Sequence, residues 1–447
     1  MRRSRVLVVV AAAAVAVAAA AAPRAILAQS WNTRVTTQSP GTNAHRQKDH
    51  VMDVSIGGHV DPGFEAVKDA FTHNFEAGRE TGAGFCLHVG GRKVVDLYGG
   101  SYDREGDRPY DRDALQLVFS STKGATAACA NLLAQRGELD LQAPVARYWP
   151  EFAQFGKEDI PVLFLLSHQA GLPAVDATLS AADVQGWDPV ITALEAQTPF
   201  WEPGTAHGYH ALTYGWLVGE VVRRVTGRSL GTFFAEEIAQ PLGLEFWIGL
   251  PEEQEHRVSP IIGGVLPEGE AGGPTDSGFS STLLARALNF GGAFSDPGWA
   301  NRRAWHVAEV PAANGITNAA SLSRLYAGLI GTVEGGPSEP ILTKDQVDSA
   351  RTVRTFGVDQ VFASVGFDMK QHIGQGFWIC SPFSPFGGAG SFGHTGAGGS
   401  YGFADPENGL AVGYVMSRMS TGMTVDPRSR PLIQACYEAV GATPKYI

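Results

Sequence analysis

Residues 118–124 read VFSSTKG, so that Ser120 precedes Lys123 by three positions. Positions i and i+3 share a face of a helix, which brings the lysine amine within reach of the serine hydroxyl. An amine that is neutral part of the time can help to deprotonate a hydroxyl, and backbone N–H groups at a helix start can receive an oxyanion. Taken alone, the pattern also fits an N-cap serine and a surface lysine. Lys123 is the only one of the eight lysines with a serine at this spacing.

The segments around this stretch predict helices and strands at both ends of the chain. Residues 84–89 and 93–98 have strand character and are separated by Gly90-Gly91, a strong hairpin signal. A second hairpin is predicted near the end of the chain, across the turn at residues 405–409. Helical spacing is found at residues 61–78, 120–136, 190–197, 212–226, 230–239, 319–330 and 430–440. We therefore expect an α/β (α+β) fold, in which an antiparallel sheet is formed from both chain ends and a helical lobe is inserted between them.

Three further stretches match the first one in order and spacing. Residues 165–173, LLSHQAGLP, closely resemble the L-L-T-H-x-S-G-L-P segment of class C β-lactamases and their relatives. Residues 209–211, YHA, stand where that family carries Y-x-N, and residues 394–396, HTG, stand where it carries K-T-G. The chain thus resembles the β-lactamase-related serine hydrolases over roughly residues 57–440. Residues 208–220, 311–315 and 396–400 look more like the serine carboxylesterase branch.

The resemblance implies a β-lactamase/transpeptidase-like fold and the cleavage of a small-molecule ester through a covalent acyl-enzyme. It implies that Ser120 is the nucleophile and that Lys123 and Tyr209 share the transfer of protons. The backbone N–H groups of Ser120 and Ala397 would form the oxyanion hole. The third motif, which would bind substrate, consists of His394, Thr395 and Gly396. The resemblance carries no metal and no organic cofactor.

Two departures from the family pattern bear on the substrate. Ala211 stands where true β-lactamases have the asparagine that binds the substrate amide, and His394 stands where they have a lysine. A histidine would present a weaker, pH-dependent positive charge. Both changes favour an esterase over the alternative, a β-lactamase or D-alanyl-D-alanine peptidase. A non-catalytic binding or assembly protein is a further alternative, but it would have no need for the serine, the lysine and the tyrosine together.

Other motifs in the chain have simpler interpretations. Residues 398–402, GGSYG, match G-x-S-x-G, but this nucleophile motif needs a preceding strand and a following helix, and Ser400 leads into a strand pattern. Residues 388–393 match G-x-G-x-x-G without the βαβ frame of a dinucleotide site. We interpret His168 as a structural residue, because no partner can be named for it.

The composition restricts the partners. A formal charge of −11 and the absence of any Lys/Arg-rich run argue against nucleic acid. With 44% hydrophobic and 18% charged residues, the 447-residue chain can form a large core. The four cysteines show neither C-x-x-C pairs nor zinc spacing and are interpreted as core thiols, although a disulfide stays open; they are Cys86, Cys129, Cys380 and Cys436.

The first residues have the pattern of an export signal. Three arginines precede an apolar run from Val6 to Ala22 that ends in small residues. We assign residues 1–28 to a signal peptide, or to a membrane anchor if they are not cleaved, residues 29–56 to a polar linker and residues 57–447 to the catalytic domain. The protein is then expected to be secreted or in the cell envelope, and cytoplasmic if the true start is near Met52. The oligomeric state is left open.

Overall fold

The computed structural model describes residues 55–263, 281–294, 296, 298–420 and 426–446. The predicted signal peptide, and the predicted linker up to residue 54, lie outside these residues. No helix within the described ranges is long and apolar enough to cross a membrane.

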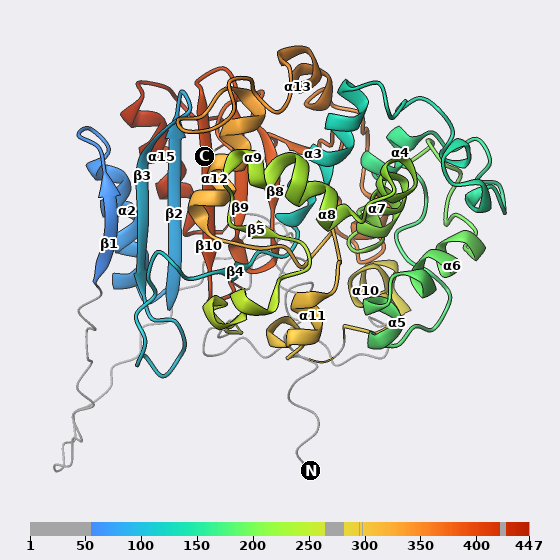
Figure 1. The fold of residues 1–447 in the computed structure, drawn as a ribbon, viewed down its shortest axis with the longest axis horizontal. Helices are drawn as coiled ribbons and strands as arrows, with labels where there is room; N and C mark the ends of the chain where they lie inside the picture. Colours follow the sequence, from blue (N-terminus) through green and yellow to red (C-terminus); the bar gives the residue numbers. More distant parts are fainter. Residues whose placement is uncertain (1–54, 264–280, 295, 297, 421–425, 447) are drawn as a thin grey trace, which may run out of the picture.

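A seven-stranded antiparallel sheet forms one side of the molecule (Figure 1). Its strands run in the order β1-β3-β2-β10-β9-β8-β7, so the first three and the last four strands of the sheet come from opposite ends of the chain. This confirms the predicted α/β fold with a sheet built from both termini. The strands are β1 (Ile56–Val60), β2 (Gly82–Val89), β3 (Arg92–Gly100), β7 (Trp378–Ile379), β8 (Phe392–Thr395), β9 (Tyr401–Asp405) and β10 (Leu410–Met416).

The two predicted hairpins form the centre of this sheet. β2 and β3 are joined by Gly90 and Gly91, both at positive φ, where glycine carries no steric cost. β2 then pairs with β10 in a continuous antiparallel register from Val89↔Leu410 to Ala83↔Met416. The side chains of β10 are buried along its whole length, because helices cover both faces of the sheet.

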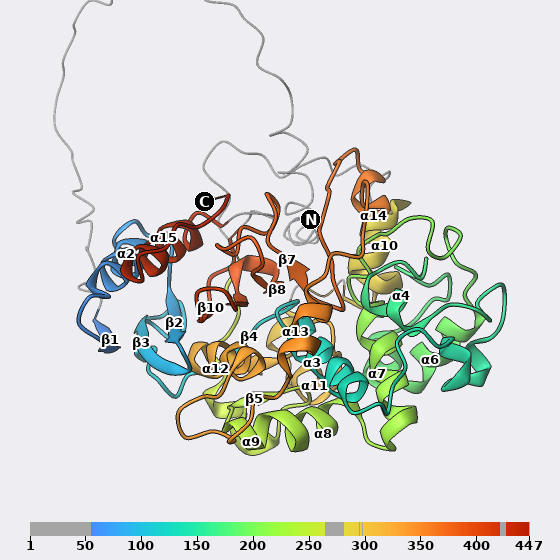
Figure 2. The ribbon, with the colours of Figure 1, turned by 90° about the horizontal axis from the view of Figure 1, so that it is seen from above.

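Helices α2 (Glu65–Glu76) and α15 (Ser429–Ala439) lie on one face of the sheet, and α12 (Ala319–Ile330) lies on the other (Figure 2). A helical lobe occupies the opposite side of the molecule (Figure 1). Helix α3 (Thr122–Gln135) lies between this lobe and the sheet and contacts both. The other helices are α4 (Val162–Leu166), α5 (Ala181–Gln185), α6 (Asp188–Ala196), α7 (Thr213–Thr226), α8 (Leu230–Phe234), α9 (Gln240–Leu242), α10 (Leu283–Asn289), α11 (Arg303–Val307), α13 (Lys344–Ala350) and α14 (Gln360–Ala363).

Two boundaries differ from the sequence prediction. The helix expected from residue 120 begins at Thr122, because Phe119 adopts a left-handed conformation, with φ of 47°, that places Ser120 in a turn. The helix expected over 230–239 ends at Phe234 and continues as a π-helical turn over Ala235–Ala239. A three-stranded sheet, β4 (Gln116–Leu117), β6 (Ile316–Thr317) and β5 (Phe246–Trp247), was not predicted, since strands of two residues carry no periodicity.

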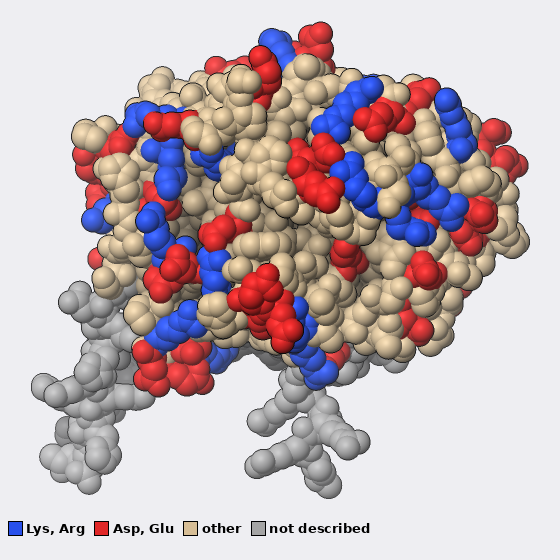
Figure 3. Space-filling model, in the orientation of Figure 1, with Lys and Arg blue, Asp and Glu red and all other residues tan. Residues whose placement is uncertain are grey.

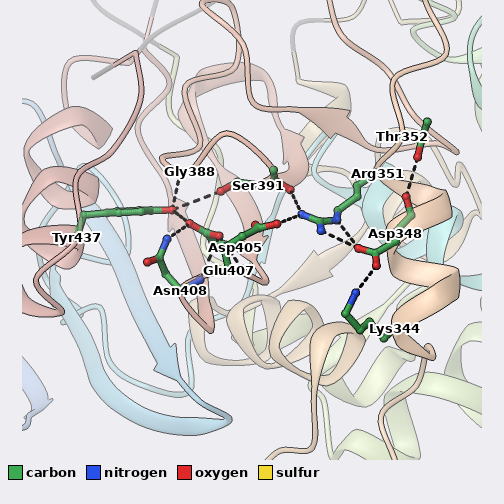
Figure 4. Close-up of polar contacts among 11 residues, drawn as sticks. Lys344, Asp348, Arg351, Thr352, Gly388, Ser391, Asp405, Glu407, Asn408 and Tyr437 are labelled. Carbon is green, nitrogen blue, oxygen red and sulfur yellow. Dashed lines mark hydrogen bonds and ion pairs between the residues drawn. The ribbon is translucent and has the colours of Figure 1, made fainter.

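The turn between β9 and β10 is anchored to its surroundings by a polar network (Figure 4). Asp405 accepts a 2.5 Å hydrogen bond from the Tyr437 hydroxyl of α15 and a 2.8 Å bond from the Asn408 side chain. Arg351, at the end of α13, pairs with Glu407 on this turn and with Asp348 on its own helix. The network joins α13, the turn and α15, which come from different parts of the chain.

Positive and negative side chains are interspersed on the face shown in Figure 3. The described structure contains ion pairs between such side chains, such as Arg228 with Glu236 and Glu237. This face therefore offers no continuous basic surface of the kind that binds a phosphate backbone.

Candidate active site

Ser120 lies at a sharp turn before α3. The left-handed Phe119 precedes it, and the backbone N–H of Lys123 donates to the Ser120 carbonyl at 3.0 Å, so that the turn leads directly into the helix. A non-glycine residue at positive φ is held there only by its surroundings. Phe119 is buried and forms a bridge with Asn314, whose side-chain amide donates to the carbonyls of Trp305 and Ala308. The packing thus fixes the backbone that carries the serine.

The Lys123 amine has three oxygen partners. Its Nζ donates to Ser120 Oγ at 3.1 Å, to the Ala211 carbonyl at 2.7 Å and to the Ala312 carbonyl at 2.9 Å. The amine has no carboxylate partner among the described residues. The structure therefore brings Ser120 and Lys123 together as their spacing predicts, and it holds the amine with neutral acceptors.

Burial gives this amine an unusual proton affinity. Lys123 is completely buried on a helix whose neighbouring residues are buried as well, and removal from water lowers its pKa well below the ordinary value of 10.5. Carbonyl oxygens can hold either an ammonium or an amine, so the geometry persists when the proton leaves. A neutral amine at 3.1 Å from a hydroxyl can accept its proton.

Tyr209 approaches Ser120 from the helical lobe. Its hydroxyl donates to Ser120 Oγ at 2.8 Å, and Lys123 Nζ lies 4.9 Å from the centre of its ring. Burial raises the pKa of this phenol, so the group keeps its proton at neutral pH. Ser120 Oγ is thus hydrogen-bonded to both residues that the sequence assigns to proton transfer.

His394 lies on β8, stacked against Trp378 with ring centroids 4.3 Å apart. Its Nδ1 lies 2.6 Å from the Thr395 carbonyl, which can only accept, so the proton is on Nδ1 and Nε2 is a bare acceptor. Nε2 is buried and has no protein partner within the described part of the chain. Burial and the nearby Lys123 lower the pKa of His394 well below 6.5. Burial thus works against the pH-dependent positive charge that the sequence analysis expects at this position.

The third motif continues into the turn that carries Ala397. After β8, residues Ala397–Gly399 form a 3₁₀ turn in which Gly398 has φ of 82° and Gly399 has φ of 117°. This turn packs against the turn that carries the nucleophile, where Ser121 Oγ donates to the His394 carbonyl at 3.4 Å. For the N–H groups of Ser120 and Ala397 we find no internal acceptor in the described residues, as groups that receive a substrate oxygen require.

The serine of the G-x-S-x-G match at residues 398–402, Ser400, has a structural position. It is completely buried at the start of β9, where its hydroxyl donates to the Val118 carbonyl at 2.8 Å and lies 3.2 Å from Ser121 Oγ. No helix follows it, in agreement with the sequence interpretation. Ser400 therefore joins the third motif to the nucleophile turn. The glycine-rich stretch 388–393 likewise precedes and enters β8 and opens no helix.

His168, which follows helix α4, connects this part of the helical lobe to the segment that carries Tyr209. It has φ of 60°, its Nδ1 accepts the backbone N–H of His210 at 3.0 Å, and its carbonyl accepts that of Gly208 at 3.0 Å. The structural interpretation of His168 thus gains a named partner. Its position next to Tyr209, with ring centroids 5.4 Å apart, could not be read from the sequence alone.

Sequence reasoning missed the groups that hold the lysine, because backbone carbonyls leave no signal in residue type. Ala211, which stands where the family has an asparagine, supplies a carbonyl to Lys123, and so does Ala312.

The described residues contain no cluster of three or more metal-binding side chains. The four cysteines are all free and buried, as the core-thiol interpretation predicts.

Comparison with known proteins places this arrangement in a family. The sequence model of the Beta-lactamase family matches residues 67–435. Esterase/beta-lactamase LipL of Mycobacterium tuberculosis is 33% identical over 380 residues, which cover 81% of this chain and 83% of LipL. The crystal structure of a family VIII carboxylesterase has a TM-score of 0.76 at 38% identity and covers 86% of this chain and 100% of its own. EstA from Arthrobacter nitroguajacolicus Rue61a has a TM-score of 0.76 at 34% identity, and the match covers 86% of this chain and 99% of the EstA chain. The match over most of its length shows that the chain belongs to the Beta-lactamase family.

Proposed function

We propose that the protein is a serine hydrolase that cleaves uncharged carboxylic esters through an acyl-enzyme on Ser120. The observation that carries this proposal is the position of Ser120 Oγ, 3.1 Å from the Lys123 amine and 2.8 Å from the Tyr209 hydroxyl. A nucleophile that is hydrogen-bonded to an amine of lowered pKa and to a protonated phenol has what acyl transfer needs. Relatives whose names or titles describe them as esterases support the same reaction.

The reaction would begin with attack of Ser120 Oγ on the ester carbonyl, while Lys123 takes the hydroxyl proton. The oxyanion would be bound by the backbone N–H groups of Ser120 and Ala397, and loss of one such donor typically costs about 10²–10³ in rate. Tyr209 would protonate the leaving alkoxide and recover a proton from Lys123. Water would then attack the acyl-enzyme and release the acid.

Two residues argue for an ester and against a β-lactam. With Ala211, the site has no side-chain amide to hold the substrate amide of a β-lactam. With a neutral His394, this position offers no cation to a carboxylate. The loss of one hydrogen bond and of one charge–charge contact costs about 1–3 kcal/mol each, which corresponds to a preference of roughly 10²-fold or more. Esters with short acyl chains need neither anchor.

The test compares kcat/KM for a short p-nitrophenyl ester and for a chromogenic cephalosporin on one preparation. We expect clear turnover of the ester and slow or no turnover of the cephalosporin. A series of esters of graded acyl length would define the acyl pocket. A cephalosporin value equal to or above the ester value would favour the β-lactamase alternative instead.

We further propose that residues 1–28 direct export, on the basis of the arginines before the apolar run up to Ala22. The mature protein would begin at Pro23 or Gln29. N-terminal sequencing of the exported protein tests this. An intact Met1 in membranes, or a start at Met52 in the cytosol, would contradict it.

A further inference from the structure

A buried arginine that lies in none of the sequence motifs contacts the turn that carries Ala397. This turn, Ala397–Gly399, presents the second proposed N–H group of the oxyanion hole. The Gly398 carbonyl accepts a hydrogen bond from Nη2 of Arg428, the residue before α15, and a 2.9 Å bond from the backbone N–H of Ser420. The Arg428 side chain is only 2% exposed. Part of the proposed active site is therefore attached to a charged side chain in the protein interior.

All five N–H groups of this guanidinium have an acceptor. Nε and one N–H of Nη2 donate to the two carboxylate oxygens of Asp426, at 2.9 and 2.5 Å. Nη1 donates to the Arg418 carbonyl at 2.8 Å and to a carboxyl oxygen of Glu80 at 3.1 Å. The other N–H of Nη2 donates to the Gly398 carbonyl. Because a guanidinium is planar and its donors have fixed directions, the four other bonds orient the one that reaches the turn.

The residues of the turn do little to fix its conformation themselves. Gly398 has φ of 82° and Gly399 has φ of 117°, and glycine reaches these values but also many others without steric cost. A Cβ on Gly399 would overlap the Asp426 carboxylate and the Arg428 guanidinium, so the two side chains lie directly against the turn. The shape of the turn is therefore set by the groups that contact it.

We propose that Arg428 is a positioning residue for ester cleavage, because its bond to the Gly398 carbonyl fixes the turn that presents the Ala397 N–H to the substrate oxygen. The proposal rests on the proposed function, in which that N–H forms half of the oxyanion hole. All donors of Arg428 are bound to protein acceptors, so it acts through the turn and not on the substrate. Oxyanion donors stabilise the transition state only when they are oriented in advance. A turn without Arg428 should therefore cost rate and leave substrate binding nearly unchanged.

Arg428→Lys and Arg428→Met test the proposal. Lysine keeps the positive charge but cannot replace the planar set of five donors, and methionine removes both. In each variant, we expect kcat for a p-nitrophenyl ester to fall about 10–100-fold, with KM changed less than about threefold. The rate is expressed per active site, counted by end-point labelling of Ser120 with a fluorophosphonate, so that a loss of folded protein does not count as a loss of rate.

A transition-state analogue gives a second readout. A trifluoromethyl ketone that adds to Ser120 places an oxyanion in the same hole, and its Ki should rise by the factor by which kcat falls. Wild-type kcat per active site in either Arg428 variant would contradict the proposal. A fall in kcat with an unchanged Ki would also overturn it, because the oxyanion hole would then be intact.

Glu220→Gln is the matched control. Glu220 is a buried carboxylate of α7 that binds Arg223 at 2.8 Å and Arg224 at 2.7 Å, in the helical lobe and not at the turn. This variant should lower the urea midpoint of unfolding but keep kcat per active site and Ki within about threefold of wild type, since it leaves the oxyanion donors in place. A loss equal to that of the Arg428 variants would show that any broken buried ion pair has this effect, and the proposal would be wrong.

Asp426→Asn decides the question if neither Arg428 variant folds. It keeps the arginine but turns an amide donor toward the N–H groups that the carboxylate accepts, so kcat per active site should fall and Ki should rise together. Wild-type values of both would contradict the proposal. Failure of the wild-type protein to cleave any ester would instead contradict the proposed function. The rate of fluorophosphonate labelling, in which a phosphoryl oxygen enters the same hole, would still test Arg428 and should fall in its variants.

Discussion

Two lysines in the described part of the chain, Lys123 and Lys157, have fully buried side chains, and the groups around their amines differ. Lys157 donates to the carbonyls of Glu195 at 2.9 Å and Gln197 at 2.6 Å, as Lys123 donates to those of Ala211 and Ala312. Burial lowers the pKa of both amines, that of Lys157 to about 8. Only Lys123 has a serine hydroxyl as its third partner. A buried, easily deprotonated lysine is therefore a structural element in one place and a candidate base in the other, and the neighbouring nucleophile makes the difference.

The largest effect is expected from removing that nucleophile. Ser120→Ala should abolish ester hydrolysis and covalent labelling by a fluorophosphonate, because the Lys123 site then resembles the Lys157 site. Ser400→Ala is the matched control, since Ser400 is buried and bound to the Val118 carbonyl. Mass spectrometry of the labelled protein is the measurement. Labelling that depends on Ser400 and persists without Ser120 would invert the assignment.

Replacing each lysine by methionine sharpens the comparison. Lys123→Met should lower kcat/KM by about 10³–10⁴, in the range for a general base. Lys157→Met should keep kcat/KM within about threefold. It should lower the free energy of unfolding by about 1–3 kcal/mol, because two buried carbonyls lose their donor. Ester kinetics and urea unfolding of both variants check this, and equal kinetic losses would show that Lys123 has no special role.

Tyr209→Phe tests the second hydrogen-bond partner of Ser120, the tyrosine hydroxyl. The Lys157 site has no equivalent of this group. The fold should persist, because the ring contacts with Phe362 and Trp378 remain. The rate should fall by roughly 10²–10⁴, the usual range for a general acid–base group. Steady-state kinetics with the circular dichroism spectrum as control measures both. Activity within a few-fold of wild type would mean that Tyr209 only packs.

The smallest effect concerns the pH dependence of stability. The ordinary pKa of 10.5 applies to Lys157 in the unfolded chain, and burial lowers it to about 8 in the folded protein. Between these values the unfolded chain binds more protons, so the contribution of Lys157 to the free energy of unfolding rises with pH from about 8 to 10.5. Lys157→Met should remove this rise. Urea unfolding of both proteins across this pH range measures it, and identical slopes would contradict the pKa shift.

The parts of the fold with a strong local signal could be predicted from the sequence. The β2–β3 turn at Gly90-Gly91 and the helix over residues 319–330 are examples, since glycine pairs and helical spacing act within a few residues. Strand β8 could not be predicted from periodicity, because it is short and both its faces are covered.

In the site, the roles proposed for Ser120, Lys123 and Tyr209 came from spacing and resemblance, and the structure places these side chains in contact. The lowered pKa of His394 could not be read from the sequence, because burial is a property of the folded chain.

The pairing of β2 with β10 has a consequence for how the protein is made. The strand that contains Val89 can pair with β10 only after the ribosome has delivered Leu410, long after it has delivered Val89. Until then the β2–β3 hairpin has an open edge, which is a template for wrong pairing with other chains. Long-range pairing also slows folding. A nascent chain that stops before Leu410 would contain Ser120, Lys123 and Tyr209 but lack β10, the strand that joins the two halves of the sheet. The central sheet can therefore be completed only after translation has passed β10.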